Sequence, residues 1–284
     1  MRDEIPSVGA VEGDETAEGV RLRYVQMGSG SPAVVLIHGA SGNLSDMTFQ
    51  LAPLIARDRT VVAFDRPGHG HSGWPDRGGE QLAVQARLMR QALAGLGIER
   101  AVLVGHSYGG SVALAWALDA PESVEGLVLV GAPSQGWKGG MGLANDLLAH
   151  PLTAGLMAYS LPMVLTPAFV ARSVERIFAP QKPPAGYVKH LRMARILNPE
   201  ALRANAVQLH ALKTQLLAMV PRYGTLPMPV EILHGTADQT VPFGMHALPL
   251  ASQIPGAALR RLDGIGHMPH HVAPAEILAA LRRL

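Results

Sequence analysis

The chain has 284 residues, of which 48% are hydrophobic and 16% are charged, enough apolar material for one large core or for a core with an insertion. The formal net charge of +2 is too small to indicate a nucleic-acid-binding protein without a local basic cluster. The absence of cysteine excludes disulfide bonds, thiolate metal sites and a cysteine nucleophile.

The first twenty residues are acidic and rich in glycine, and we expect the start of this stretch to be loosely held. They contain no apolar stretch of the kind found in a secretory signal. No run approaches the ~18 apolar residues of a membrane-spanning helix. We therefore predict a soluble, cytoplasmic protein without a membrane span. The oligomeric state stays open, a homo-oligomer included.

Short apolar runs bounded by turn residues predict a series of strands. Residues 21–26 alternate polar and apolar side chains, as an exposed edge strand would. The later runs are apolar on both faces, which suits parallel strands covered by helices. They comprise residues 33–37, 60–65, 101–105, 126–130 and 230–233, with a weaker run at 257–262. Helix-period segments at 80–96 and 108–119 alternate with them, which predicts an α/β sandwich.

The alternation of strands and helices stops between residues 134 and 222. This stretch indicates helices only: one from Thr166 to before Pro180, another over residues 185–197, and a third with Asn198 as its cap and Pro199 at its first position. After residue 227 the strand pattern resumes. We interpret the stretch as a helical cap inserted into one α/β core.

The segment Gly105-His106-Ser107-Tyr108-Gly109 follows a buried strand and opens a helix. The pattern G-x-S-x-G in that context is typical of a nucleophile elbow, a tight turn that lifts the serine hydroxyl above the edge of the sheet. A glycine-rich turn with an ordinary capping serine is the alternative interpretation. The order of the surrounding elements favours a nucleophile at Ser107.

Four further segments accompany this turn: LIHG at 36–39, DRPGHGHS at 65–72, HGTADQTVP at 234–242 and GIGH at 264–267. With them the chain resembles the α/β-hydrolase superfamily, in its esterase- and lipase-like serine hydrolase branch with a helical cap. The resemblance extends from about residue 21 to the C-terminus. It implies a mostly parallel eight-stranded sheet with helices on both faces. The core would comprise residues 1–133 and 223–284, and the cap residues 134–222.

A serine nucleophile needs a base, and the base needs a partner that fixes its tautomer. By resemblance, His267 is the base and Asp238 the acid, in the chain order that this fold uses. His270 and His271 are rivals for the base, but they fit surface or cap-facing positions better. The family carries an acidic residue five positions after its base, where this chain has Val272. We interpret that change as a lost supporting contact.

The oxyanion hole needs two donors, which the resemblance assigns to the backbone N–H groups of Tyr108 and Ala40. Ser41, in the same small-residue loop as Ala40, is a candidate substrate contact or a simple turn residue.

The remaining histidines do not predict a metal site. The pairs His69 and His71, and His270 and His271, lack a paired carboxylate at ligand spacing, so we expect neither metal nor cofactor. The segment from Asp65 to Ser72 has glycines but no lysine that opens a helix, so it is not a phosphate loop, and we expect a structural role for it.

The predicted cap is basic, with ten Lys or Arg against three Asp or Glu between residues 134 and 222. A solvated face is the favoured interpretation; attraction of an anionic substrate or a membrane surface is the alternative. Its methionines suit packing, and a few of them a tunnel for an apolar group. They are Met141, Met157, Met163, Met193 and Met219.

These features predict a serine hydrolase that cleaves a small-molecule carboxylic ester, with an apolar acyl or alcohol group, through an acyl-enzyme on Ser107. Three alternatives stay open: a carbon–carbon bond hydrolase of a vinylogous diketone, a cofactor-free perhydrolase or haloperoxidase-like enzyme, and a binding protein without turnover. The complete set of Ser107, Asp238 and His267 argues against the last of these.

Overall fold

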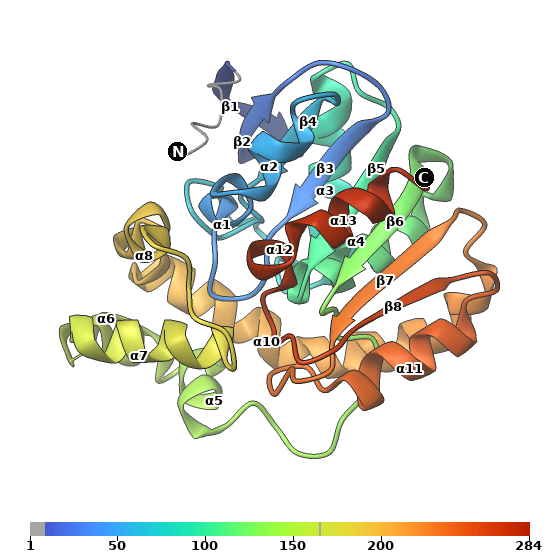
Figure 1. The fold of residues 1–284 in the computed structure, drawn as a ribbon. Helices are drawn as coiled ribbons and strands as arrows, with labels where there is room; N and C mark the ends of the chain where they lie inside the picture. The colour runs from blue at the N-terminus through green and yellow to red at the C-terminus, as the bar shows by residue number, and fades with distance from the viewer. Residues whose placement is uncertain (1–8, 165) are drawn as a thin grey trace.

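The computed structural model describes residues 9–164 and 166–284, and one eight-stranded sheet forms its centre. The strands follow the order β1-β2-β4-β3-β5-β6-β7-β8. β2 pairs antiparallel with β1 and β4, and all other neighbours are parallel, which confirms the mostly parallel sheet predicted from the sequence. Helices cover both faces of the sheet (Figure 1). The strands are β1 (Ala10–Ala17), β2 (Val20–Met27), β3 (Ala33–Ile37), β4 (Val61–Phe64), β5 (Ala101–His106), β6 (Val124–Val130), β7 (Val230–Gly235) and β8 (Ala258–Leu262).

The first two strands form a hairpin at the edge of the sheet. Glu18 and Gly19 connect them with φ values of 50° and 79°, as tight hairpin turns require. One expectation is therefore wrong: the strand predicted at residues 21–26 lies inside the sheet, between β1 and β4, and not at its edge. The charged side chains of β1 give no strand pattern in the sequence. In the structure the partner strand β2 compensates these charges, with Arg23 Nε 3.0 Å from Asp14 Oδ1. Residues 1–8 lie outside the described residues.

The central strands carry side chains alternately into two apolar cores, one on each face of the sheet. Val35 and Ile37 of β3 pack into the core shared with α3 and α4. Val34 and Leu36 pack into the opposite core, shared with α1, α2 and α13. This twofold periodicity explains why the strands are apolar throughout. The helices of the sandwich are α1 (Leu44–Thr48), α2 (Leu51–Ile55), α3 (Leu82–Gly95), α4 (Tyr108–Asp119), α11 (Phe243–Gln253), α12 (Pro269–Val272) and α13 (Pro274–Leu281).

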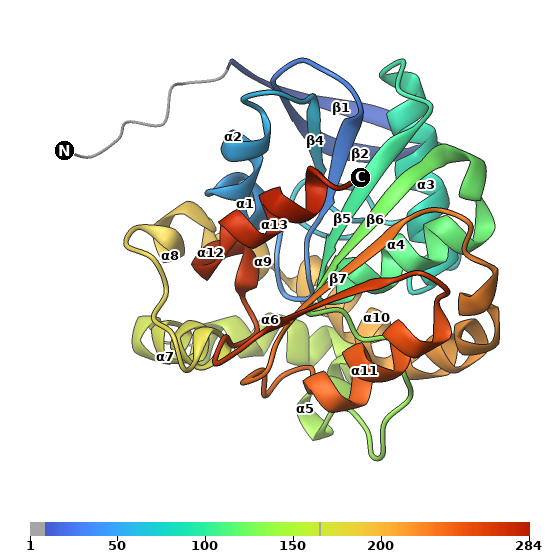
Figure 2. The same ribbon diagram turned by 45° about the vertical axis from the view of Figure 1, so that its right-hand side comes forward.

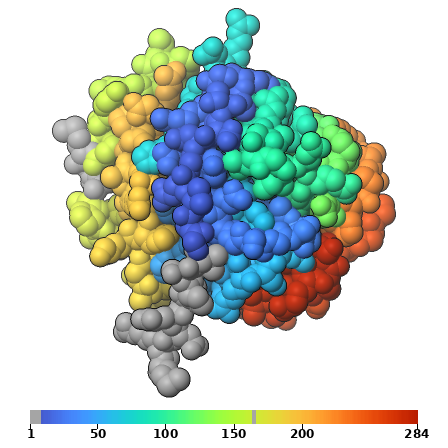
Figure 3. Space-filling view, turned by 90° about the horizontal axis from the view of Figure 1, so that it is seen from above, coloured from blue at the N-terminus to red at the C-terminus, as the bar shows by residue number. Residues whose placement is uncertain are grey.

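Between β6 and β7 the described residues form helices and no strand, as the sequence predicts. These helices lie beyond the carboxyl ends of the parallel strands (Figure 2), and from above they gather on one side of the molecule (Figure 3). They are α5 (Leu143–Ala149), α6 (Ala154–Val164), α7 (Pro167–Phe178), α8 (Tyr187–His190), α9 (Met193–Ile196) and α10 (Pro199–Met219), followed by a 3-10 helix (Val220–Thr225). Thr166 caps α7, and Asn198 caps α10.

The helix expected over residues 185–197 is broken into α8 and α9. Arg192, between them, adopts a left-handed conformation with φ of 51°. The Asn43 side chain donates a hydrogen bond to the Leu191 carbonyl at 2.9 Å, which satisfies an acceptor that the end of α8 would leave free. A contact from the core thus ends the helix, and the local sequence does not encode it.

Among the described residues, no helix taken alone has the length and apolar composition needed to cross a membrane. Residues 154–162 and 167–178 would meet that criterion only as a pair, and the two segments are bent by 102° relative to each other.

Candidate active site

Ser107 lies at a strained turn between β5 and α4. Its φ of 50° and ψ of −125° are unusual for a residue with a side chain. A Cβ atom on Gly105 would come within 2.5 Å of the Gly109 carbonyl oxygen, and one on Gly109 would collide with the Ile37 carbonyl. The two glycines of the G-x-S-x-G pattern are therefore required by close backbone packing. The local turn is that of the elbow motif.

The structure brings together the three side chains that the sequence singled out. His267 Nε2 lies 3.0 Å from Ser107 Oγ, and His267 Nδ1 lies 2.7 Å from Asp238 Oδ2. All three residues are buried. Because a carboxylate can only accept, the Nδ1 proton points to Asp238 and leaves Nε2 free to accept the serine proton. They come from three different strand-to-helix loops at the carboxyl edge of the sheet.

Asp238 is tightly held in its ionised form. Its Oδ1 accepts hydrogen bonds from the backbone N–H groups of Thr240 and Val241, both at 2.8 Å. His234 Nε2 lies 3.3 Å from Oδ2 and donates to the Val241 carbonyl. Burial alone would raise the pKa of Asp238, but the hydrogen bonds from His234 and His267 outweigh it and hold the pKa below the ordinary range. His234, which the sequence analysis missed, supports the carboxylate from the end of β7.

The loop after β3 lies against the serine. A Cβ atom on Gly39 would be 3.1 Å from the Ser107 Cβ, so the absence of a side chain permits this approach. Ala40 and Tyr108 line the same cavity as Ser107 and His267. Ser41 also lies in the cavity wall, with its backbone N–H donating to Asn205 Oδ1 of α10 at 2.7 Å. The loop is therefore fastened to the inserted helices.

A cavity of about 640 Å³ opens onto these residues. Its walls are mainly apolar and come largely from the inserted helices, with Phe169, Leu202 and Leu209 among them. Of the methionines singled out in the sequence, Met141 and Met193 line the cavity, whereas Met157 and Met219 pack into apolar clusters elsewhere. The side chain of Met163 lies outside the described residues.

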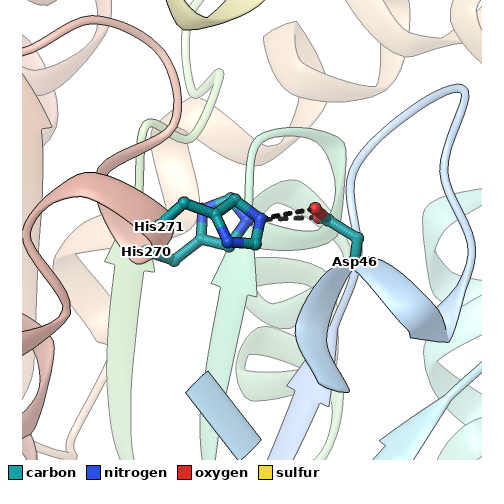
Figure 4. A group of neighbouring side chains, drawn as sticks. All are labelled: Asp46, His270 and His271. Carbon is teal, nitrogen blue, oxygen red and sulfur yellow. Dashed lines mark hydrogen bonds and ion pairs between the residues drawn. The ribbon is translucent and has the colours of Figure 1, made fainter. Parts of the chain in front are cut away.

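Asp46, His270 and His271 form a buried cluster, with both histidines turned toward the Asp46 carboxylate (Figure 4). His271 Nε2 lies 2.8 Å from Asp46 Oδ1, and His270 Nε2 lies 3.2 Å from Oδ2. The Tyr187 hydroxyl donates to Oδ1 at 2.6 Å. Burial alone would raise the pKa of Asp46, but its histidine partners hold it well below the ordinary range. Neither histidine lies at the surface, so that part of the expectation is wrong. His271 does face the helices between β6 and β7, with its ring centre 4.6 Å from that of Tyr187, whereas His270 packs against His106 of the core.

The cluster also supplies the carboxylate whose absence argued against a metal ion, since its three ligand atoms lie within 4.8 Å of one another. Its surroundings, however, do not fit a metal site. A metal-bound imidazole normally donates a hydrogen bond through its other nitrogen. Among the described residues, neither His270 Nδ1 nor His271 Nδ1 has a partner. The contacts instead fasten α12, the helix directly after His267, to α1.

The profile of the α/β-hydrolase fold matches residues 32–274, which is most of the chain. The chain belongs to the α/β-hydrolase fold family. A Mycobacterium tuberculosis protein described as uncharacterized is 34% identical over 275 residues, covering 94% of this chain and 79% of that protein. The dihydrolipoyllysine-residue acetyltransferase component of an acetoin cleaving system of Cupriavidus necator is 32% identical, covering 99% and 72%.

Solved structures of the same fold include enzymes of several substrate classes. A bacterial membrane phospholipase A superimposes with a TM-score of 0.76 at 22% identity, covering 97% of this chain and 85% of the other. The 2-hydroxy-6-oxo-6-phenylhexa-2,4-dienoate hydrolase of a Rhodococcus strain gives 0.77 at 24% identity, covering 98% and 99%. At these identities the likeness shows the fold alone. Membership of the family supports a hydrolase activity and leaves its substrate open.

Proposed function

We propose that the chain is a serine hydrolase that cleaves a small-molecule carboxylic ester through an acyl-enzyme on Ser107. The observation that carries the proposal is the continuous hydrogen-bonded series from Ser107 Oγ through His267 to Asp238, at 3.0 and 2.7 Å. A serine needs this arrangement to become a nucleophile at neutral pH. The family supports hydrolysis in general.

The reaction would follow in two stages. Ser107 Oγ attacks the ester carbonyl carbon while His267 Nε2 takes its proton, and the N–H groups of Ala40 and Tyr108 stabilise the oxyanion. The carbonyl re-forms, the C–O bond to the alcohol breaks, and His267 returns the proton to the leaving alkoxide. Water then attacks the acyl-enzyme with His267 as base, which releases the acid and restores Ser107. No step needs a cofactor.

The apolar walls of the cavity favour a substrate with an apolar acyl or alcohol group. We assign these walls to a cap of residues 134–222 inserted in the hydrolase core of residues 1–133 and 223–284. Ser41 remains a candidate substrate contact because it lines the cavity.

A carbon–carbon bond hydrolase is the second candidate, because a 2-hydroxy-6-oxo-6-phenylhexa-2,4-dienoate hydrolase of Burkholderia cepacia is 27% identical over 253 residues, covering 87% of this chain and 85% of that enzyme. The mainly apolar walls of the cavity favour the neutral ester over an acidic diketone.

The test is hydrolysis of p-nitrophenyl esters of increasing acyl length by the native chain, by Ser107→Ala and by Ser252→Ala. Ser252 is exposed, and among the described residues its hydroxyl bonds only to the Pro249 carbonyl. We expect turnover by the native and Ser252→Ala proteins and a loss of about 10⁴-fold or more in kcat for Ser107→Ala. A folded Ser107→Ala protein that retains turnover would remove Ser107 from the role of nucleophile. If no ester is cleaved but a vinylogous diketone is, the second candidate replaces the first.

A further inference from the structure

A fully buried arginine lies behind the two backbone amides assigned to the oxyanion hole. Arg66 lies two residues after the end of β4 and has no exposed surface. Within the described ranges its guanidinium forms no ion pair with a carboxylate, and its partners are carbonyl and amide oxygens. Burying a cation without an ion-pair partner is costly, so its presence at this position points to a use for its charge.

The guanidinium donates hydrogen bonds to two consecutive peptide groups of the loop after β3. Its Nε donates to the His38 carbonyl and its Nη2 to the Gly39 carbonyl, both at 3.0 Å. Its remaining arm, Nη1, donates to Gln85 Oε1 at 3.0 Å and to Gln208 Oε1 at 2.7 Å. Gln208 belongs to α10, so a helix from the segment between β6 and β7 also binds the guanidinium.

The Gly39 carbonyl and the Ala40 N–H belong to the same peptide group and point in opposite directions because the peptide is trans. A charged donor on the carbonyl polarises the group and strengthens the N–H as a donor at its other end. His38 Nδ1 adds a second hydrogen bond to the same carbonyl at 2.8 Å. Its proton is fixed there because His38 Nε2 accepts from the Arg66 backbone N–H at 3.0 Å.

The guanidinium also contacts the residue that carries the other amide. Its carbon lies 4.4 Å from the centre of the Tyr108 ring, and Gln85 Nε2 donates to the Tyr108 hydroxyl at 3.1 Å. A single cation thus contacts both the peptide group that carries the Ala40 N–H and the side chain of Tyr108, the two residues assigned as oxyanion donors. An anion that forms at Ser107 would meet its field in a buried environment, where charges are weakly screened.

The titratable neighbours compensate this charge only in part, because the nearby Asp65 carboxylate raises the pKa of Arg66 but forms no ion pair with it among the described residues. Burial lowers the pKa of Arg66 to about 10, so it stays protonated at neutral pH. Burial and the charge of Arg66 lower the pKa of His38 to about 3 and that of His69 well below the usual range, so both rings are neutral. The Asp65 carboxylate binds the backbone N–H groups of Leu44 and His71.

We propose that Arg66 is a positioning residue that polarises the Gly39–Ala40 peptide and places a fixed positive charge behind the oxyanion formed on Ser107. It forms and breaks no covalent bond and keeps its proton throughout. The inference rests on the proposed function, because an oxyanion has to form at Ser107. It also changes the interpretation of the segment from Asp65 to Ser72, for which the sequence predicted a structural role alone.

The experiment compares Arg66→Lys, Gln85→Glu and Gln215→Glu with the native chain. Arg66→Lys keeps the charge but loses the fork that grips both carbonyls. Gln85→Glu leaves the fork intact and places a carboxylate at the oxygen that accepts from Nη1, which neutralises the charge. It also removes the Nε2 donor to the Tyr108 hydroxyl and the Gly79 carbonyl, and the methyl ketone control detects any disturbance of the cavity that results. Gln215→Glu is the matched control, because Gln215 accepts from the Leu82 N–H and does not contact Arg66.

Each protein is assayed for kcat and KM on the best p-nitrophenyl ester, and for binding of a trifluoromethyl ketone and of the methyl ketone of equal chain length. The trifluoromethyl ketone forms a tetrahedral oxyanion adduct with a serine, and the methyl ketone does so much less readily. For Arg66→Lys and Gln85→Glu we expect kcat and trifluoromethyl ketone affinity to fall together by about 10- to 100-fold, while KM and methyl ketone affinity change by less than about threefold. Gln215→Glu should match the native protein.

The inference is overturned if folded Arg66→Lys and Gln85→Glu proteins retain both kcat and trifluoromethyl ketone affinity. Equal losses for the two ketones also overturn it, because they indicate a disturbed cavity and no specific effect on the oxyanion. Should Arg66→Lys fail to fold, Gln85→Glu alone decides. A native chain that neither cleaves esters nor prefers the trifluoromethyl ketone refutes the proposed function itself, and the role of Arg66 with it.

Discussion

Asp238 is held by more donors than a turn-capping carboxylate needs. Two backbone N–H groups fix its Oδ1, which leaves Oδ2 directed at His267. Because Oδ1 and Oδ2 have different partners, Asp238 fixes the proton of His267 on Nδ1. The same contacts predict what the isosteric substitution Asp238→Asn would do to this proton.

In Asp238→Asn, the amide oxygen has to face the Thr240 and Val241 N–H groups, so the NH₂ group faces His267 Nδ1. The ring must then carry its proton on Nε2, where it cannot accept the proton of Ser107. We expect kcat for ester hydrolysis to fall by about 10³- to 10⁴-fold with little change in thermal stability.

Asp263→Asn, at an exposed carboxylate paired only with Arg261 among the described residues, is the control and should keep native activity. An Asp238→Asn protein within tenfold of the native kcat would show that the acid lies elsewhere.

At the scale of elements, α12 is short and depends on its contacts with α1. Four residues cannot form a stable helix alone, and Asp46 of α1 accepts hydrogen bonds from both His270 and His271. His106 adds a contact from the elbow, with Nε2 2.9 Å from the His267 carbonyl oxygen. The sequence suggested that Val272 leaves the base without a supporting contact. In the structure, Asp46 and His106 hold the segment that carries the base.

Asp46→Asn keeps the shape of the side chain but removes the charge and half of its acceptor capacity. We expect the free energy of unfolding to fall by about 2–4 kcal/mol in urea denaturation, because buried donors on His270, His271 and Tyr187 lose a charged acceptor. Since α12 directly follows His267, kcat should fall as well. Unchanged stability would mean that the cluster does not fasten α12.

On the scale of the whole molecule, buried histidines make stability depend on pH. Burial lowers the pKa of His38 to about 3 and that of His270 to about 4, each from an ordinary value near 6.5. The unfolded chain therefore binds protons more readily than the folded chain between pH 6.5 and 4, and stability is lost as the pH falls through that window. Asp65 has the opposite effect on stability, because burial raises its pKa to about 6 and the folded chain then binds its proton more readily than the unfolded chain.

The histidines outnumber this one carboxyl group, so we expect the free energy of unfolding to fall by roughly 3 kcal/mol between pH 7 and pH 4.5. Denaturant titrations at several pH values measure it. His270→Gln retains a donor toward Asp46 without a titrating ring, and its pH dependence should be shallower. Equal slopes for the native and His270→Gln proteins would contradict the burial of a neutral His270.

The amino-acid sequence by itself determined the parts of this protein that depend on local chemistry. Apolar runs gave the buried strands, and the range of α4 agrees with the helix predicted at 108–119 because the elbow motif fixes its start. Spacing and motif resemblance also selected Ser107, Asp238 and His267, which the fold brings within hydrogen-bonding distance.

Only the tertiary structure decided the features that depend on a distant partner. β1 pairs with β2, which compensates its charges. The segment 185–197 is broken where Asn43 donates a hydrogen bond to the Leu191 carbonyl. His270 and His271 are buried where they donate to Asp46. In the sequence, Arg66 belongs to a segment predicted to be a turn. Its burial against the loop after β3 depends on contacts with that loop, with α3 and with α10. Each of these contacts joins residues far apart in the chain, whereas periodicity and propensity report on neighbours alone.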